Sequence, residues 1–456
     1  MVILTATEAE RLQATIAGAL LTRVELGERV ALVDGDGSLD ANRLCFVGGA
    51  LRVGIIPVVL NAALTTAERD ALLRDAQPTL TLDDVTLAAM TDAGPTADLS
   101  PAPLGRPMLY TSGTTGVPKG VWTGVLTEAE AIALQQEEAD LWGFDASDRH
   151  LVCGNAHHSA PVRFALGTLA AGGDVILPGK FDAPTQSRAL RDYAPTSSFM
   201  APVHLHRLLD LSHDDPSLFA NFRMLAHAGA PCADAVKHRA LTTLPAGSVW
   251  EFYGSTEGQF TACGPDDWLA RPGTVGRARP GRTLTVDDDG AIWCAPPTFA
   301  RFEYWNDPAK TASAWRTRDG VREFTVGDLG RLDDDGFLYL DGRRDDLILT
   351  GGVNVYPAEV EKVLLDVPGV TDAAVFPRDD DHWGQRVCAV YVGDPSPDHV
   401  AAALRARLAG YKRPKELHQR DEIPRSANGK IRRTALARCL FHLGLSRALR
   451  FRRACR

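Results

Sequence analysis

The sequence lacks several patterns that mark particular protein classes. No apolar run in its 456 residues approaches the ~18 residues that span a bilayer. The chain does not open with a basic segment followed by an apolar stretch, so we expect no signal peptide. Its 49 basic and 58 acidic residues give a net charge of −9, which excludes a generally basic, nucleic-acid-binding surface. We therefore expect a soluble, cytoplasmic protein that binds no nucleic acid and has no membrane-spanning segment.

The spacing of the cysteines indicates neither a metal site nor a disulfide framework. The eight cysteines never form C-x-x-C and lie far apart in mostly apolar surroundings, so we expect reduced, buried thiols. Glycine and proline show no fixed period, and the chain contains no internal repeat. Hydrophobic residues make up 45 %, which is ample for a large core.

Apolar runs alternate with helix-forming stretches over the first 280 residues. This alternation predicts a mainly parallel sheet with helices on its faces. Helices are expected after the capping boxes Thr7-x-x-Glu10 and Thr65-x-x-Glu68, and over 41–53. Strands are expected at 29–33, 55–60, 79–82, 174–177, 196–200, 224–228 and 248–252.

The pattern changes after about residue 280, where short strands and Asp/Gly turns predict a small β-rich part. Its strands are expected at 283–286, 291–294 and 336–340. A compact α+β unit is then predicted, with helices at 357–365 and 397–408 and strands at 370–376 and 386–392. We expect an N-terminal domain over 1–342, a hinge at 343–345, a C-terminal domain over 346–440 and a basic tail over 441–456. The tail is expected to be solvated, with an anionic partner as the alternative.

The strongest chemical signal is YTSGTTGVPKG at 110–120. Its glycines let backbone N–H groups approach a phosphate, its hydroxyls add neutral donors, and Lys119 adds a positive charge. It is not a Walker A loop, because Pro118 precedes the lysine and Gly120 follows it.

This loop resembles the phosphate-binding loop of the AMP-forming adenylating enzymes, which include acyl-CoA synthetases, luciferases and adenylation domains of peptide synthetases. Further segments in the family's order support the resemblance: AGAP at 228–231, FYGSTEG at 252–258, TVGD at 325–328, GRRDD at 342–346, GGVNVYPAEVE at 351–361 and NGKI at 428–431. The wider context is most similar to acyl-CoA ligases of the fatty-acid and bile-acid type. One departure is that fewer residues precede the loop than is usual, so we expect the family's opening elements to be missing.

The resemblance implies a fold and an activity. The fold class is α/β: a large body with parallel sheets flanked by helices and a small β-rich subdomain, plus a small mobile α+β C-terminal domain. The ATP site is expected in the cleft between the two. The implied reaction joins a carboxylic acid to ATP as acyl-AMP, releasing pyrophosphate, and then forms an acyl-CoA thioester.

The resemblance also implies roles for single residues. Lys430, Thr256, Glu257 and His158 are the expected catalytic residues, and Glu257 and Thr115 the expected Mg²⁺ ligands. Asp345 is the expected hinge. The residues expected to bind ATP or CoA are Thr111, Ser112, Gly113, Thr114, Thr115, Gly116, Lys119, Gly229, Ala230, Pro231, Phe252, Tyr253, Gly254, Ser255, Asp328, Arg343, Gly351 and Gly352.

Some assignments stay open on sequence alone. His157 or His158 gates the acyl pocket or is structural, and Phe164, Trp250 and Phe252 line that pocket or belong to the core. Arg163 pairs with a second substrate carboxylate or is exposed, and the basic turn at 411–414 binds CoA phosphates or is solvated. The acceptor is CoA or, alternatively, a carrier protein or an amine; a non-catalytic nucleotide-binding protein is the third reading. A monomer or homodimer is expected.

Overall fold

The computed structural model describes residues 1–33, 35, 37–62, 64–92, 94–111, 118–211, 215–343, 346–350, 353–380, 383–425, 431, 433 and 436. The chain forms two compact units. The larger unit comprises Met1–Leu284 and Trp293–Val326, and the smaller unit comprises Thr285–Ile292 and Gly327–Arg456. The units thus divide at Gly327, before the expected hinge, of which residues 344 and 345 lie outside the described residues.

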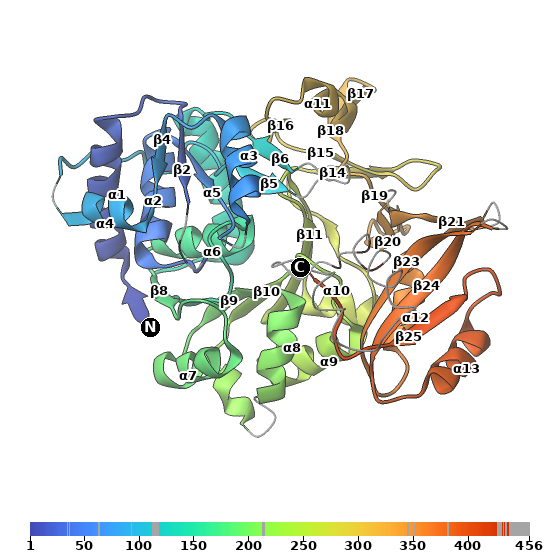
Figure 1. The fold of residues 1–456 in the computed structure, drawn as a ribbon. Helices are drawn as coiled ribbons and strands as arrows, with labels where there is room; N and C mark the ends of the chain where they lie inside the picture. The colour runs from blue at the N-terminus through green and yellow to red at the C-terminus, as the bar shows by residue number, and fades with distance from the viewer. Residues whose placement is uncertain are drawn as a thin grey trace. The chain divides into compact units, whose positions relative to one another are not determined.

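An eight-stranded sheet dominates the larger unit, in the order β1-β8-β7-β9-β10-β11-β12-β13 (Figure 1). Its central strands are parallel: β8 (Asp174–Leu177), β7 (Arg149–Val152), β9 (Ser197–Met200), β10 (Met224–His227) and β11 (Val249–Gly254). Antiparallel strands close both edges: β1 (Val2–Leu4) at one, and β12 (Gln259–Cys263) with β13 (Arg277–Ala278) at the other. The helices of this region are α5 (Glu128–Trp142), α6 (Ser159–Ala170), α7 (Ala183–Tyr193), α8 (Pro202–Leu211), α9 (Asp234–Thr243) and α10 (Pro265–Ala270), with a 3₁₀ turn at Pro216–Phe219.

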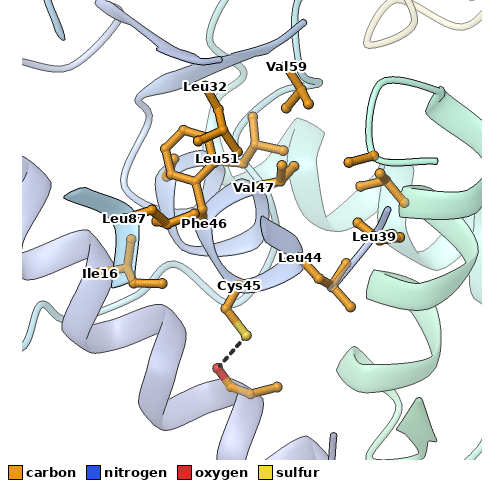
Figure 2. Close-up of a cluster of buried hydrophobic side chains, with 14 of the residues drawn as sticks. Ile16, Leu32, Leu39, Leu44, Cys45, Phe46, Val47, Leu51, Val59 and Leu87 are labelled. Carbon is orange, nitrogen blue, oxygen red and sulfur yellow. Dashed lines mark hydrogen bonds between the residues drawn. The ribbon is translucent and has the colours of Figure 1, made fainter. Parts of the chain in front are cut away.

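A second, parallel sheet of the larger unit has the order β3-β2-β4. Its strands are β2 (Arg29–Leu32), β3 (Ile56–Val59) and β4 (Leu80–Leu82), and its helices are α1 (Ala6–Leu21), α2 (Ala41–Arg52), α3 (Thr66–Ala76) and α4 (Asp84–Asp92). Figure 2 shows the core formed here, in which Phe46 and Leu44 are fully buried. Burial of each such side chain contributes about 1.5–3 kcal/mol. The Cys45 thiol donates to the Ala9 carbonyl at 3.8 Å, so this cysteine is structural.

Short antiparallel strands complete the larger unit. The strands β5 (Leu109–Thr111), β6 (Lys119–Trp122) and β16 (Glu303–Tyr304) form one sheet in the order β16-β6-β5, and α11 (Pro308–Ala314) follows β16. A four-stranded sheet has the order β14-β15-β18-β17, in which β18 (Val321–Phe324) pairs with both β15 (Ile292–Ala295) and β17 (Trp315–Arg318). Its edge strand β14 (Thr283–Val286) ends within Thr285–Ile292, which is grouped with the smaller unit.

The smaller unit has its own core. Its five-stranded sheet contains β21 (Ile348–Thr350), β22 (Val353–Val355), β23 (Val370–Asp380), β24 (Gly384–Gly393) and β25 (Glu416–Gln419). Two helices accompany it, α12 (Pro357–Leu365) and α13 (Pro397–Arg407), and a separate hairpin joins β19 (Asp328–Leu332) to β20 (Leu338–Arg343). Val360, Leu364 and Tyr391 are buried in this core.

The observed elements confirm the α/β class and most predicted strands, but the first capping box is wrong. Thr5 caps α1 and Glu8 completes the box, whereas Thr7 and Glu10 lie inside the helix. Both pairs have the same spacing, so the pattern could not choose between them. Strand β1 ends at Leu4, which makes Thr5 the first residue free to cap, and Glu10 instead accepts from Arg52 at 3.0 Å.

Candidate active site

Predicted nucleotide-binding segments follow two adjacent strands of the large sheet. Strands β10 and β11 are parallel neighbours, with Ala226 opposite Trp250. Their carboxyl ends therefore lie at the same edge, where parallel sheets place ligands. Gly229, Ala230 and Pro231 come shortly after β10, and Tyr253 and Gly254 end β11. The fold thus brings the two predicted segments together. Gly229 has φ +91°, a conformation that favours glycine.

The two aromatic residues at the end of β11 face different surroundings. Phe252 lies in a buried aromatic cluster with Trp142 and Phe164, at ring distances of 5.6 and 6.0 Å. Phe252 is thus a core residue of this cluster. Tyr253 packs on Phe260 at 4.8 Å and is also largely buried.

The turn after β11 is tightly built. The Ser255 amide donates to the Gly258 carbonyl at 2.8 Å, and the Gln259 side chain donates to the Ser255 carbonyl at 3.4 Å. A Cβ on Gly254 would lie 2.8 Å from Gln259 Oε1, so a larger residue would displace that amide. The Ser255 hydroxyl is buried and has no hydrogen-bond partner within the described part of the chain. An unpartnered buried hydroxyl suits a ligand oxygen.

Glu257 supplies a buried carboxylate directly after this turn. Its Oε1 accepts a hydrogen bond of 2.9 Å from the Tyr304 hydroxyl, and both residues are buried. No group of three or more His, Cys, Asp or Glu residues suited to a metal occurs among the described residues. A single carboxylate matches Mg²⁺, which usually keeps several waters and is held by one or two carboxylates plus substrate phosphates. Glu257 therefore fits the implied ion.

The predicted phosphate loop joins two paired strands. Thr111 at the end of β5 lies opposite Lys119 at the start of β6, so the two ends of the predicted loop are held side by side by an antiparallel strand pair. The predicted ligands Ser112, Gly113, Thr114, Thr115 and Gly116 lie outside the described residues. Lys119 Nζ pairs with Asp307 Oδ2 at 2.7 Å, and this bond lowers the pKa of Asp307.

The two candidate histidines lie directly before α6. His158 is the N-cap residue, and its ring lies 4.2 Å from that of His157. Both ring nitrogens of His157 are buried without a partner in the described structure, and burial lowers its pKa to about 4. His157 is therefore neutral near pH 7.

Arg163 lies one turn further along α6. The sequence left open whether its side chain is exposed, and the structure shows that it is not. Its Nη1 bonds both oxygens of Glu138 at 2.8 Å. Its guanidinium carbon also lies 5.2 Å from the centre of the Phe252 ring.

The smaller unit holds the remaining predicted ligands. Asp328 begins β19 and lies opposite Arg343 on β20, so the pairing of these strands brings these two predicted nucleotide-binding residues together. Asp328 is buried. Lys412 of the predicted CoA-binding turn forms an ion pair with Glu359. Lys430, Asp345, Gly351 and Gly352 lie outside the described residues.

Sequence reasoning missed two side chains, Tyr304 and Asp307. They contact Glu257 and Lys119 from 47 and 188 residues away in the chain. The Asp307-Pro308 pair, typical of a helix start, is the one local signal near them.

Two further findings concern the cysteines and the possibility of membrane-spanning helices. Five of the six described cysteines are buried, as expected, whereas Cys232 is half-buried. Within the described residues, no helix has both the length and the hydrophobicity needed to cross a bilayer.

Comparison with known proteins gives concordant matches. Residues 107–297 match the family model of the AMP-binding enzymes, and residues 359–430 match that of the AMP-binding enzyme C-terminal domain. An indoleacetate–CoA ligase of Aromatoleum aromaticum is 33 % identical over 344 residues, covering 71 % of this chain and 65 % of the relative. A 2-succinylbenzoate–CoA ligase of Bacillus licheniformis is 33 % identical over 72 % of this chain and 69 % of its own. A long-chain-fatty-acid–CoA ligase of Mycobacterium tuberculosis is 29 % identical over 90 % and 88 %.

A solved structure extends the similarity to the whole fold. ATP-bound MatB from Rhodopseudomonas palustris superposes with a TM-score of 0.81 at 27 % identity, covering 94 % of this chain and 92 % of that one. The match with the indoleacetate ligase spans slightly less than two thirds of that relative, whereas this superposition spans nearly all of both chains.

Proposed function

Because the chain belongs to the AMP-binding enzyme family, we propose that it is an ATP-dependent acyl-CoA ligase. It activates a carboxylic acid as acyl-AMP with release of pyrophosphate, and then transfers the acyl group to the thiol of CoA. The observation that carries this proposal is the turn after β11, where a buried, unpartnered Ser255 hydroxyl precedes the buried Glu257 carboxylate. ATP and CoA as substrates support a cytoplasmic location.

The first half-reaction brings a carboxylate against a triphosphate, so neutralising charge is the main catalytic task. Ser255 and Thr256 donate hydroxyl hydrogen bonds to the α-phosphate or the acid, and Lys119 supplies positive charge at the end of the phosphate loop. Glu257 holds Mg²⁺, which when bound neutralises phosphate charge. Lys430 stabilises the transition state of adenylation, and Asp328 and Arg343 bind the ribose.

The second half-reaction needs room for the pantetheine arm of CoA. Gly351 and Gly352 provide it, because they carry no side chain. The smaller unit, turning at Asp345, exchanges Lys430 for this glycine pair between the two half-reactions. The acid itself stays open, since the similar ligases are named for aryl, succinyl-aryl and long-chain acids.

Pyrophosphate release with a panel of acids, with and without CoA, tests the proposal. The panel contains indoleacetate, 2-succinylbenzoate, a bile acid and fatty acids of increasing length, and mass spectrometry identifies the products. A CoA-dependent thioester from one acid class is the expected result. Acyl-AMP without thioester would instead indicate another acceptor. No pyrophosphate from any acid, in folded protein that binds ATP, would overturn the proposal.

The Lys430→Ala variant separates the two steps. We expect it to lose adenylation and to keep thioester formation from supplied acyl-AMP. Wild-type pyrophosphate release by this variant would contradict the role given to Lys430.

A further inference from the structure

The segment 303–307 is fastened to the start of β6. Strand β16 pairs antiparallel with β6, so that Tyr304 lies opposite Val121. The Trp305 amide then donates to the Gly120 carbonyl at 2.8 Å. Figure 1 shows β16 beside β6 and β5. These backbone bonds hold Tyr304 next to Lys119, the residue that ends the phosphate loop.

Tyr304 contacts both charged groups of the site. Its hydroxyl donates to Glu257 Oε1 at 2.9 Å, and the centre of its ring lies 5.9 Å from Lys119 Nζ. The ring distance is at the outer limit of a cation–π contact, so the hydroxyl bond is the stronger of the two. One tyrosine thus touches the carboxylate expected to hold the metal and the lysine expected to hold phosphate.

The hydrogen bond from Tyr304 occupies one carboxylate oxygen of Glu257 and leaves the other available to bind a cation. Oε1 accepts from Tyr304, whereas Oε2 accepts no hydrogen bond from the described residues. A carboxylate held through one oxygen keeps its orientation and presents the other to a cation. Partners of metal ligands commonly act in this way, and their loss typically costs about 10–100-fold in metal affinity.

The tyrosine hydroxyl has no comparable part in packing. The Tyr304 ring packs edge-on against Phe302 at 5.5 Å, and phenylalanine would keep this contact. Substitution by phenylalanine therefore removes the hydroxyl that donates to Glu257 and keeps the ring contact with Phe302.

We propose that Tyr304 is a positioning residue that orients Glu257 for Mg²⁺ on the nucleotide. This inference rests on the proposed function, because it takes Glu257 as the metal ligand.

The test compares Tyr304→Phe with Tyr391→Phe. Tyr391 is a matched control, because it is a fully buried tyrosine in the smaller unit whose hydroxyl donates to the Pro395 carbonyl at 2.7 Å. Binding of Mn²⁺ to the protein with a non-hydrolysable ATP analogue is measured by electron paramagnetic resonance, which requires no turnover. We expect Tyr304→Phe to weaken Mn²⁺ binding about 10-fold and Tyr391→Phe to leave it unchanged.

A steady-state measurement adds a second readout. Tyr304→Phe should raise the Mg²⁺ concentration needed for half-maximal pyrophosphate release and leave the KM for the acid unchanged. Unchanged Mn²⁺ affinity in Tyr304→Phe, or an equal loss in both variants, would overturn the inference. Because Mn²⁺ binding is read without any acid, it tests Tyr304 even if every acid of the panel fails, an outcome that would count against the ligase function alone.

Discussion

Two buried glutamates of the larger unit, Glu138 on α5 and Glu251 on β11, respond in opposite ways to their surroundings. Burial by itself raises the pKa of both. At Glu138 the arginines outweigh burial and lower the pKa to about 2, whereas at Glu251 a single lysine does not, and the pKa stays raised. Equal burial therefore gives a fixed charge in one place and a carboxyl that readily takes a proton in the other.

The difference lies in the number and geometry of partners. Glu138 accepts from Arg163 at 2.8 Å, from Arg279 at 2.6 Å and from the Trp142 indole at 3.0 Å. Glu251 accepts from Lys237 at 3.4 Å, and this lysine also donates to His227 at 2.6 Å. Lys237 is thus shared, and Glu251 receives the weaker bond.

Removing the charge of Glu138 should have the largest effect. The Glu138→Gln variant leaves the largely buried Arg163 without its carboxylate and leaves Arg279 with Glu137 alone, so we expect a loss of about 3–5 kcal/mol in the free energy of unfolding. Urea denaturation at pH 7 measures it, with Glu130→Gln as a control for a half-buried carboxylate that pairs with the exposed Arg301. A loss below about 1 kcal/mol would show that the arginines find other partners.

The two glutamates should also give opposite pH dependences. The folded pKa of Glu138 is below its ordinary value of 4.5, so its stabilisation is present above that pH and is lost as pH falls toward 2. The shift corresponds to about 3 kcal/mol. Glu251 has a raised folded pKa, so its stabilisation is present below pH 4.5 and is lost as pH rises through the folded value.

Denaturation curves between pH 3 and 8 check both signs. The stability gap between the wild type and Glu138→Gln should shrink toward pH 3. The wild type should lose stability relative to Glu251→Gln as pH rises above 4.5. If the stability of the wild type and of both variants changed with pH in the same way, the predicted opposite pH dependences of the two glutamates would be wrong.

Lys237→Met should cost less than the loss of Glu138, about 1–3 kcal/mol. Glu251 can take a proton once its lysine is gone, so the cost should grow with pH. A double-mutant cycle with Glu251→Gln measures the coupling between the two residues. Strict additivity would show that the lysine acts through His227 instead.

The smallest stability effect is expected at the Lys119–Asp307 pair, whose side chains are 18 % and 33 % exposed. Asp307→Asn keeps an oxygen to accept the Lys310 amide at the start of α11 and removes the charge facing Lys119. The unfolding free energy should change less than in any of the variants above, because exposed ion pairs contribute little to stability. The KM for ATP should change more clearly, because Lys119 is left free to move. An unchanged KM would show that Asp307 does not hold this lysine for the nucleotide.

Local patterns predicted much of the fold and the outline of the site. The box at Thr65 and Glu68 is confirmed, and α12 has the predicted bounds, because their signals lie within a few residues. The buried glutamate networks and the contacts of Tyr304 and Asp307 had no such signal. They depend on which strands become neighbours, and Glu138 meets Arg279 across 141 residues. The roles of Thr115 and Lys430 stay predictions, because both residues lie outside the described part of the chain.

The antiparallel strand β1 has a consequence for synthesis. Val2 pairs with Leu177 at the edge of the large sheet, so the partner of strand β1 is made some 175 residues later. At about 5–20 residues per second, a ribosome needs on the order of 10–30 s to reach that partner. Throughout that interval Val2, Ile3 and Leu4 of the nascent chain have no strand partner. During this time a chaperone or the edge of another sheet could bind them.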